Sequence, residues 1–227
     1  MKKILTTALC LIGLTSSITA QEASDSEESV PPAEIGFYIS AGAVFNGDYH
    51  INDRLAVAGL PDVAPIMPEV TIGYTISRQK YLLDAEVNAG YLNSNSVETS
   101  KKLTTTSVAV KLRAQHIPFT SENFSISLGA DVSYLSSFIN LYHTNNIDLN
   151  SVNLNYGGHI TLNNEWFYAG PSLALGLFRT YDIPINLNMG YELALTNGYW
   201  TSNFADVQNS VKESGHSRFY IKMRVNF

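Results

Sequence analysis

The sequence is poor in cysteine and in charge. Its single cysteine, Cys10, lies in the first apolar stretch, so the rest of the chain has no thiol for a disulfide or a Cys-based metal site. Charged residues make up 15% of the chain, and acids outnumber bases, giving a formal net charge of −6. Because nucleic-acid binding needs basic clusters, we expect no nucleic-acid partner.

Catalytic and cofactor motifs are also missing. There is no HExxH metal motif and no phosphate-binding glycine loop, so we expect no metal ion and no cofactor. The five histidines are scattered along the chain, at His50, His116, His143, His159 and His216. Asp48 and His50 with Asp53, or His216 with Ser217, could supply acid–base or nucleophile pairs. Exposure to water in surface loops explains these polar residues more simply, and we expect no catalytic site.

The first 34 residues divide into two segments. Two lysines precede a mostly apolar stretch, residues 4–14, and small residues then lead to Ala20. This pattern predicts a secretory signal peptide over residues 1–20, and the apolar run is too short for a transmembrane helix. Residues 21–34 are acidic and polar, which predicts a short flexible arm in the periplasm. The uniform texture of residues 35–227 predicts one domain.

Apolar and polar side chains alternate through most of this domain. In the last segment, apolar residues alternate with polar residues that include three cations, Arg218, Lys222 and Arg224. A period of two indicates a β-strand with one apolar face. Similar alternation predicts eight strands, over residues 35–45, 69–76, 81–92, 107–115, 124–135, 166–178, 185–195 and 217–227.

Each predicted strand has one apolar face, and its other face is rich in Gly, Ser and Asn. This contrast predicts strands that separate lipid from a crowded polar interior. Because unpaired backbone groups are costly in a bilayer, such a sheet must close on itself. The predicted fold is therefore all-β, an eight-stranded antiparallel transmembrane up-and-down β-barrel. Ten strands would result if residues 152–162 and 199–208 also formed strands. A soluble β-sandwich or lipocalin-like barrel, with its apolar faces inward, is the other alternative.

The expected connections alternate in length. Residues 77–80, 117–123 and 179–184 are short connections, whereas residues 46–68, 93–106, 136–165 and 196–216 are long ones. Outer-membrane barrels have short periplasmic turns and longer extracellular loops, so we expect both termini in the periplasm. The first long loop is unusually apolar, and we expect it to fold over the barrel mouth or to contact a partner. Its apolar residues are Leu55, Val57, Leu60, Val63, Ile66 and Met67.

Charged residues on the polar faces predict an ion-pair network in the lumen. Its members are Asp84, Glu86, Lys111, Arg113, Asp131, Glu192, Lys222 and Arg224. Acids and bases fall on alternate strands, so neighbours can pair, and Asp84 should lie near Lys111 or Arg113. An eight-stranded lumen is only wide enough to be filled by side chains, and buried ions need partners. We interpret the network as a salt-bridged plug; the alternative is a charged constriction in a narrow pore or a ligand-binding lumen.

The apolar face of the last strand ends on an aromatic carboxyl terminus. Its residues are Phe219, Ile221, Met223, Val225 and Phe227. This strand resembles the closing strand of bacterial outer-membrane β-barrels, whose last residue is typically Phe. With the signal peptide, the alternation and the loop asymmetry, residues 35–227 resemble the small OmpA/OmpX-like barrel proteins.

This resemblance implies a protein of the outer membrane of a Gram-negative bacterium. Its partners would be the lipid bilayer and, through the C-terminal strand, the barrel-assembly machinery, while the extracellular partner stays unidentified. The resemblance implies a non-enzymatic role in envelope structure or in surface interaction through the loops. A narrow pore or small-molecule transport barrel is the alternative, followed by a lipid-modifying or proteolytic outer-membrane enzyme.

Overall fold

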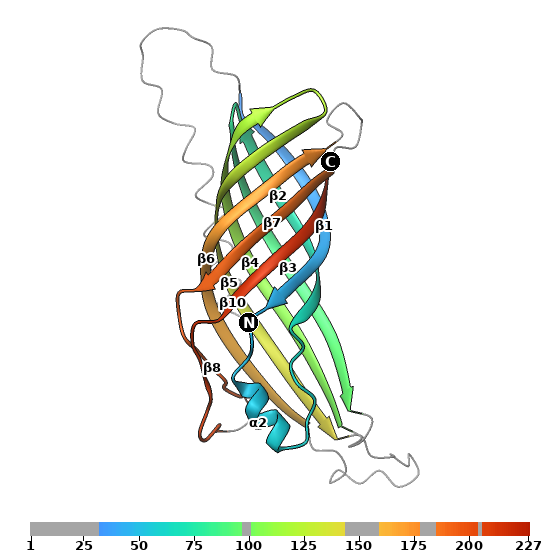
Figure 1. The fold of residues 1–227 in the computed structure, drawn as a ribbon, viewed down its shortest axis with the longest axis vertical. Coiled ribbons are helices and arrows are strands. Elements are labelled where there is room, and N and C mark those ends of the chain that lie inside the picture. Colours follow the sequence, from blue (N-terminus) through green and yellow to red (C-terminus); the bar gives the residue numbers. More distant parts are fainter. Residues whose placement is uncertain (1–31, 97–100, 144–158, 178–184, 204–205) are drawn as a thin grey trace. The chain divides into compact units, whose positions relative to one another are not determined.

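A computed structural model describes residues 32–96, 101–143, 159–177, 185–203 and 206–227. The predicted signal peptide and almost all of the predicted acidic arm lie outside the described residues. Eight long strands form one closed antiparallel barrel, in the order β1-β10-β7-β6-β5-β4-β3-β2 (Figure 1). The strands are β1 (Glu34–Asn46), β2 (Ile66–Arg78), β3 (Tyr81–Ser96), β4 (Lys101–Thr120), β5 (Phe124–His143), β6 (His159–Leu177), β7 (Ile185–Ala194) and β10 (Ser217–Asn226). The predicted eight-stranded fold is confirmed.

Among the described residues, three small elements lie outside the ring of strands. Helix α2 (Ile51–Val57) lies between β1 and β2, and the two-residue strands β8 (Gly198–Tyr199) and β9 (Lys212–Glu213) pair with each other between β7 and β10. The ten-strand alternative is wrong, because residues 159–162 begin β6 and β8 does not join the barrel. Within the described part of the chain, no helix has the length and apolar character needed to cross a membrane.

Several strands run further than the sequence predicted. Residues 93–106 and 136–165 were expected to be long loops, yet β3 continues to Ser96, β4 begins at Lys101, β5 continues to His143 and β6 begins at His159. Strand pairing persists here, since β4 and β5 stay in register out to Lys101 and His143. The contrast between apolar and polar faces fades over residues 101–106 and 136–143, so periodicity could not reveal these extensions. Residues 159–162 lie within the additional strand that the sequence left open.

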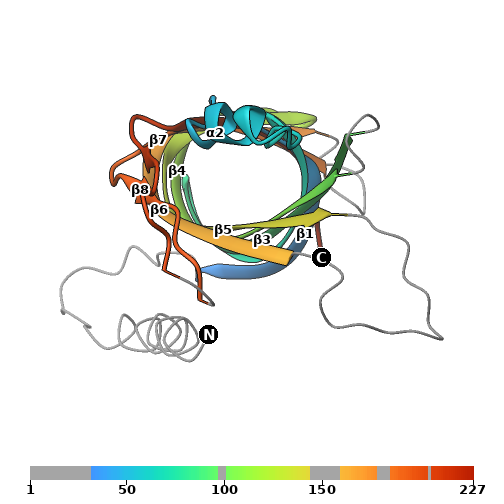
Figure 2. The ribbon, with the colours of Figure 1, turned by 90° about the horizontal axis from the view of Figure 1, so that it is seen from below.

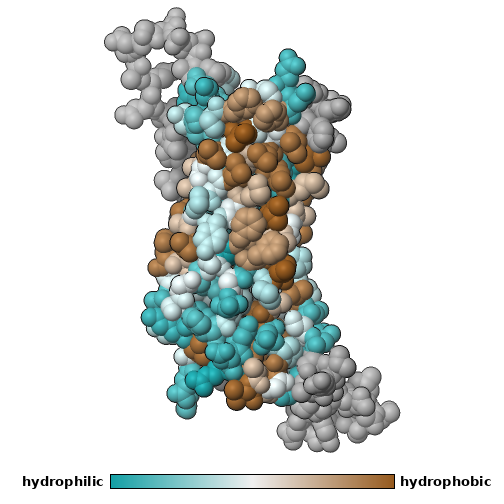
Figure 3. All heavy atoms as spheres, viewed as in Figure 1, coloured by the Kyte–Doolittle hydropathy of each residue, from teal (hydrophilic) through white to brown (hydrophobic). Residues whose placement is uncertain are grey.

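The outer face of the barrel is apolar over much of its height. Apolar side chains gather over the upper part of the face shown in Figure 3, and hydrophilic ones gather at the end where α2 lies. Outward-facing apolar residues with exposed side chains include Ile39, Ile72, Val87, Leu128, Leu193 and Met223. In the soluble alternatives these faces would point inward, so those alternatives are wrong.

The barrel closes where β1 pairs with β10. Gly42 lies opposite Lys222 in this seam. A Cβ atom at Gly42 would clash with the carbonyl oxygen of Ile221, so only glycine allows this approach of the two backbones. The close approach at Gly42 lets β1 pair with β10 at this point, where Lys222 lies on the inner face of the barrel.

Candidate functional site in the lumen

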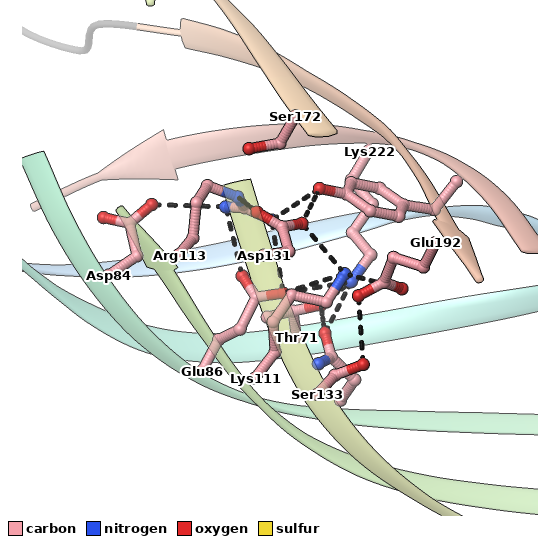
Figure 4. Close-up of polar contacts among 12 residues, drawn as sticks. Thr71, Asp84, Glu86, Lys111, Arg113, Asp131, Ser133, Ser172, Glu192 and Lys222 are labelled. Carbon is pink, nitrogen blue, oxygen red and sulfur yellow. Dashed lines mark hydrogen bonds and ion pairs between the residues drawn. The ribbon is translucent and has the colours of Figure 1, made fainter. Parts of the chain in front are cut away.

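The inner face of the barrel carries the charged residues that the sequence singled out. Because side chains alternate along a strand, every second residue points into the lumen. The structure places all eight residues there, none more than 6% exposed: Asp84, Glu86, Lys111, Arg113, Asp131, Glu192, Lys222 and Arg224. Figure 4 shows most of them meeting in one group of contacts.

Arg113 on β4 contacts carboxylates on both neighbouring strands. Its guanidinium lies 3.2 Å from Asp84 and 3.4 Å from Glu86 on β3, and 3.1 Å from Asp131 on β5. The fixed fork of Arg donors suits several carboxylates at once. Arg113 therefore joins three adjacent strands from the inside.

Lys111 extends the network across the lumen. Its ammonium group lies 3.4 Å from Glu192 on β7, a strand separated from β4 by β5 and β6, and 3.5 Å from Asp131. The same group lies 3.5 Å from the centre of the Tyr220 ring, on β10. Cations interact favourably with the face of an aromatic ring, so Tyr220 contributes to holding this ammonium group.

The last strand adds two more cations to the network. Lys222 lies 2.5 Å from Glu69 on β2 and 3.5 Å from Glu86, and it donates a hydrogen bond to Asn88. Arg224 pairs with Asp84 at 2.8 Å. The lumen therefore contains acids and bases that neutralise each other.

Some members of the network were missed by sequence reasoning. Arg218 pairs with Glu192 at 2.6 Å, and Glu69 pairs with Lys222. The hydroxyl of Tyr38 donates to Glu86 at 2.9 Å, and that of Tyr220 donates to Asp131. Arg218 was recognised as a cation on the polar face of the last strand and could have been included.

A second layer, which we call the cap, lies at one end of the barrel. It consists of residues 47–65, 198–203 and 206–216. Here β4, β5 and β6 continue past the ends of β1 and β10, and α2 lies across from them (Figures 1 and 2). Apolar residues of the cap pack against inward residues of the extended strands. They form one buried cluster of Tyr49, Ile51, Leu55, Val63, Leu103, Ala109, Leu135, Ile139, Leu141, Trp166, Tyr168 and Trp200.

The first long loop was expected to fold over the barrel mouth or to contact a partner, and its apolar residues pack against inward residues of the extended strands at that end. Leu55 and Val63 are buried, Met67 is buried within β2, and Leu60 packs against the cluster. Val57, by contrast, is 89% exposed. One face of α2 packs in the buried cluster at the barrel end, and the other remains on the surface.

Glu213 joins the two halves of the cap. Its carboxylate accepts hydrogen bonds from the backbone N–H groups of His50 at 2.8 Å and Ile51 at 3.0 Å, and from the indole of Trp200 at 2.8 Å. The first residues of a helix leave N–H groups without partners, and α2 has no capping side chain of its own. Glu213 supplies that cap from a distant part of the chain.

His216, the last residue of the cap, lies among aromatic side chains. Its Nδ1 atom is 2.8 Å from the hydroxyl of Tyr168, and its ring lies 4.6 Å from that of Tyr49 and stacks on Trp166. Burial, with the nearby positive charge of Arg218, lowers the pKa of His216 to about 4. His216 is therefore a neutral, structural histidine at neutral pH.

The catalytic pairs considered from sequence are not formed. Among the described residues, His216 makes no hydrogen bond to Ser217, and His50 makes none to Asp48 or Asp53. His50 lies instead 3.5 Å from Glu213. In the described ranges, no group of three His, Cys, Asp or Glu residues is arranged to hold a metal ion.

A closed eight-stranded barrel with an apolar outer face and a charged, filled interior is the architecture of small outer-membrane β-barrels. Solved barrels of this kind share the fold. Neisserial surface protein A (NspA) is 10% identical, with a TM-score of 0.51 over 86% of this chain and 98% of that one. A major outer membrane protein from Thermus thermophilus is 9% identical, with a TM-score of 0.52 over 85% of this chain and 99% of that one.

These likenesses show the fold alone, because the identities are near 10%. No family model matches the sequence, and a comparison with curated proteins found no match. The chain thus has the fold of the small outer-membrane barrels that its sequence resembles.

Proposed function

We propose that this protein is an integral outer-membrane barrel with a non-conducting lumen, which serves as a structural component of the envelope and presents a recognition surface at its cap end. The observation that carries this proposal is the set of ion pairs across the lumen. Lys111 on β4 reaches Glu192 on β7, and Lys222 on β10 reaches Glu86 on β3.

Two layers would oppose the passage of an ion. The ionic layer has both signs in contact, whereas a selective pore more often has a ring of one sign. Beyond it, the buried cluster at the cap end is mostly apolar and contains no charged side chain to compensate a dehydrated ion. An open path would require breaking the ion pairs and lifting the cap together.

The outer face supports placement in a lipid bilayer. The lumen charges are shielded from the exterior, and the outward faces of the strands are apolar. In the last strand the outward residues are Phe219, Ile221, Met223, Val225 and Phe227, which we propose as the signal read by the barrel-assembly machinery. The predicted signal peptide agrees with export to the outer membrane. Flotation with lipid vesicles and recovery in the outer-membrane fraction test this location.

Single-channel recording in a planar bilayer tests the closed lumen. We expect no steady openings from the refolded protein, and the Arg54→Gln variant, changed on the exposed side of α2, should behave alike. Steady openings whose conductance changes on replacing Arg113 or Lys222 would contradict the proposal and favour the transport alternative. The enzyme alternative is tested by mass spectrometry of outer-membrane lipids with and without the protein.

The extended strands and the cap support the recognition role. β3 pairs with β2 only as far as Gly90, while its residues 91–96 pair with β4 alone, so one strand edge is left without a neighbour in the ring. Exposed edges invite pairing with another chain. Trypsin treatment of intact cells tests the orientation, and we expect cleavage near Lys101 and Lys102. Cleavage only after the envelope is disrupted would contradict it.

A further inference from the structure

The outer wall of the barrel carries an apolar groove near the end opposite the cap. It has a volume of about 550 Å³ and crosses β2, β3, β4 and β5. Ile76, Leu83, Ala114 and Leu128 line its length. The small side chain of Ala114 lies directly across from Leu83, which leaves room between the larger neighbours. The groove is therefore open to whatever surrounds the barrel.

A break in strand pairing lies beside the groove. The register between β4 and β5 shifts between His116 and Phe119, and Pro118 falls within this shift. Proline has no N–H group for the strand ladder, and such bulges bend a strand locally. The groove thus lies where the wall is irregular.

Polar side chains gather at the turn end of the groove. Arg78 lies opposite Tyr81, and Tyr81 lies opposite His116, so the three form one row around the outside of β2, β3 and β4. The rings of Tyr81 and His116 are 5.2 Å apart. Arg78 is exposed and makes no ion pair or hydrogen bond with another described residue. One end of the groove therefore offers a cation without a partner among the described residues, an imidazole and a phenol.

This arrangement has the two parts of a lipid site. A charged side chain on the outer face of a barrel is costly near the bilayer midplane and tolerated near the interface. At the interface, an anionic headgroup is the natural partner for a guanidinium group. Ile76, Leu83 and Ala114 form the next row of the wall, one step further from the turn. Leu128 continues the first row opposite His116, so an acyl chain beside the headgroup would lie across these apolar side chains.

We propose that the groove binds one anionic glycerophospholipid of the periplasmic leaflet, with its phosphate beside Arg78 and His116 and an acyl chain along Leu83, Ala114 and Leu128. This inference rests on the proposed outer-membrane location, which sets the turn end at that leaflet. It goes beyond general contact with lipid, because it predicts one bound molecule with a preferred headgroup.

Native mass spectrometry of the folded barrel released from detergent micelles tests this inference. Dioleoyl phosphatidylglycerol and dioleoyl phosphatidylethanolamine are added at equal concentration. We expect one phosphatidylglycerol molecule to be retained about fivefold better, the size of effect expected from one basic residue near anionic lipid. The double variant Arg78→Gln, His116→Gln should lose this preference, and Ala114→Leu should reduce retention of both lipids by filling the groove.

The matched control is Arg54→Gln, which removes an exposed cation at the other end of the barrel and should keep the preference. Equal retention of the two lipids by the unchanged protein, or a preference that survives the double variant, would overturn the inference. Competition by glycerol phosphate, which has no acyl chains, would also overturn it in favour of a simple anion site.

Flotation with vesicles of the same two lipids separates this test from the proposed function. A barrel that floats with vesicles but retains no preferred lipid contradicts the groove site alone. A barrel that does not float contradicts both the location and the site. Channel openings in an inserted barrel would contradict the closed lumen and leave the lipid site standing.

Discussion

Arg113 on β4 lies directly opposite Asp84 on β3, and the two side chains form an ion pair of 3.2 Å inside the barrel. The same guanidinium contacts Glu86 and Asp131. One cation thus contacts three carboxylates that have almost no access to solvent, and Lys111, Lys222 and Arg224 share in compensating them. Buried ion pairs add little net stability compared with apolar packing, but removing one partner leaves uncompensated charge. Loss of Arg113 should therefore leave buried carboxylates on two neighbouring strands short of a partner.

Replacing Arg113 with alanine should destabilise the barrel by about 3–5 kcal/mol, because uncompensated acids would remain buried. The measurement is urea-induced unfolding in lipid vesicles or detergent micelles. The control is Arg54→Ala on the exposed side of α2, which should change stability by less than about 0.5 kcal/mol. An Arg113→Ala protein as stable as the control would show that water already compensates the acids.

The contact between Asp84 and Arg113 could be predicted from sequence because it depends only on alternation and strand order. Alternation marks which side chains share a face, and adjacent strands of an up-and-down barrel pair in sequence order. The same reasoning also anticipated the lumen position of Lys111. Its contact with Glu192 could not be predicted, because it depends on side chains meeting across the lumen.

The cap could be predicted only in part. The apolar residues of the first loop pointed to burial, but nothing in the sequence paired that loop with Glu213. The three donors to Glu213 belong to His50, Ile51 and Trp200, which come from two separate loops. No local periodicity marks such a contact, because it forms only when the barrel brings the loops together.

The pair of Arg218 and Glu192 offers a second test of the lumen. Arg218→Met alone and Glu192→Leu alone should each destabilise the barrel, since each leaves one buried charge behind. The double variant should lose less than the sum of the two, with a coupling energy of about 1–3 kcal/mol by a double-mutant cycle in urea unfolding. Strictly additive losses would mean that the 2.6 Å contact contributes nothing specific.

Glu213→Gln should loosen the cap. In glutamine an NH₂ group replaces one carboxylate oxygen, and this group cannot accept a hydrogen bond from the N–H groups at the start of α2. We expect the loss of one buried hydrogen bond to cost about 1–3 kcal/mol of cap stability. Arg54 is the one trypsin site within residues 47–65, so its cleavage rate reports cap opening. We expect at least about tenfold faster cleavage. The control is Asp62→Asn, an exposed acid in the same loop, and equal rates in the two variants would contradict the role of Glu213.

His216 should make the cap sensitive to acid. Burial holds its pKa at about 4, below the ordinary histidine value of 6.5. Between these two pH values the unfolded cap binds a proton and the folded cap does not, so stability rises with pH across that window and falls on acidification. The loss on acidification to pH 4 should reach about 3 kcal/mol, and this histidine should contribute no pH dependence once the pH is about one unit above 6.5, where the unfolded histidine is neutral too.

Tryptophan fluorescence during urea unfolding can measure this effect, because both tryptophans of the chain, Trp166 and Trp200, are buried in the apolar cluster at the cap end. The His216→Gln variant should be less stable at neutral pH because it loses packing. The comparison between the two proteins is therefore of how steeply the free energy of unfolding changes with pH, and not of its absolute value. The variant should lose most of the decline between pH 6.5 and 4, while carboxylates elsewhere titrate equally in both proteins. Parallel curves of unfolding free energy against pH for the two proteins would contradict this prediction. They would show that the aromatic neighbours of His216 do not keep it neutral in the folded cap.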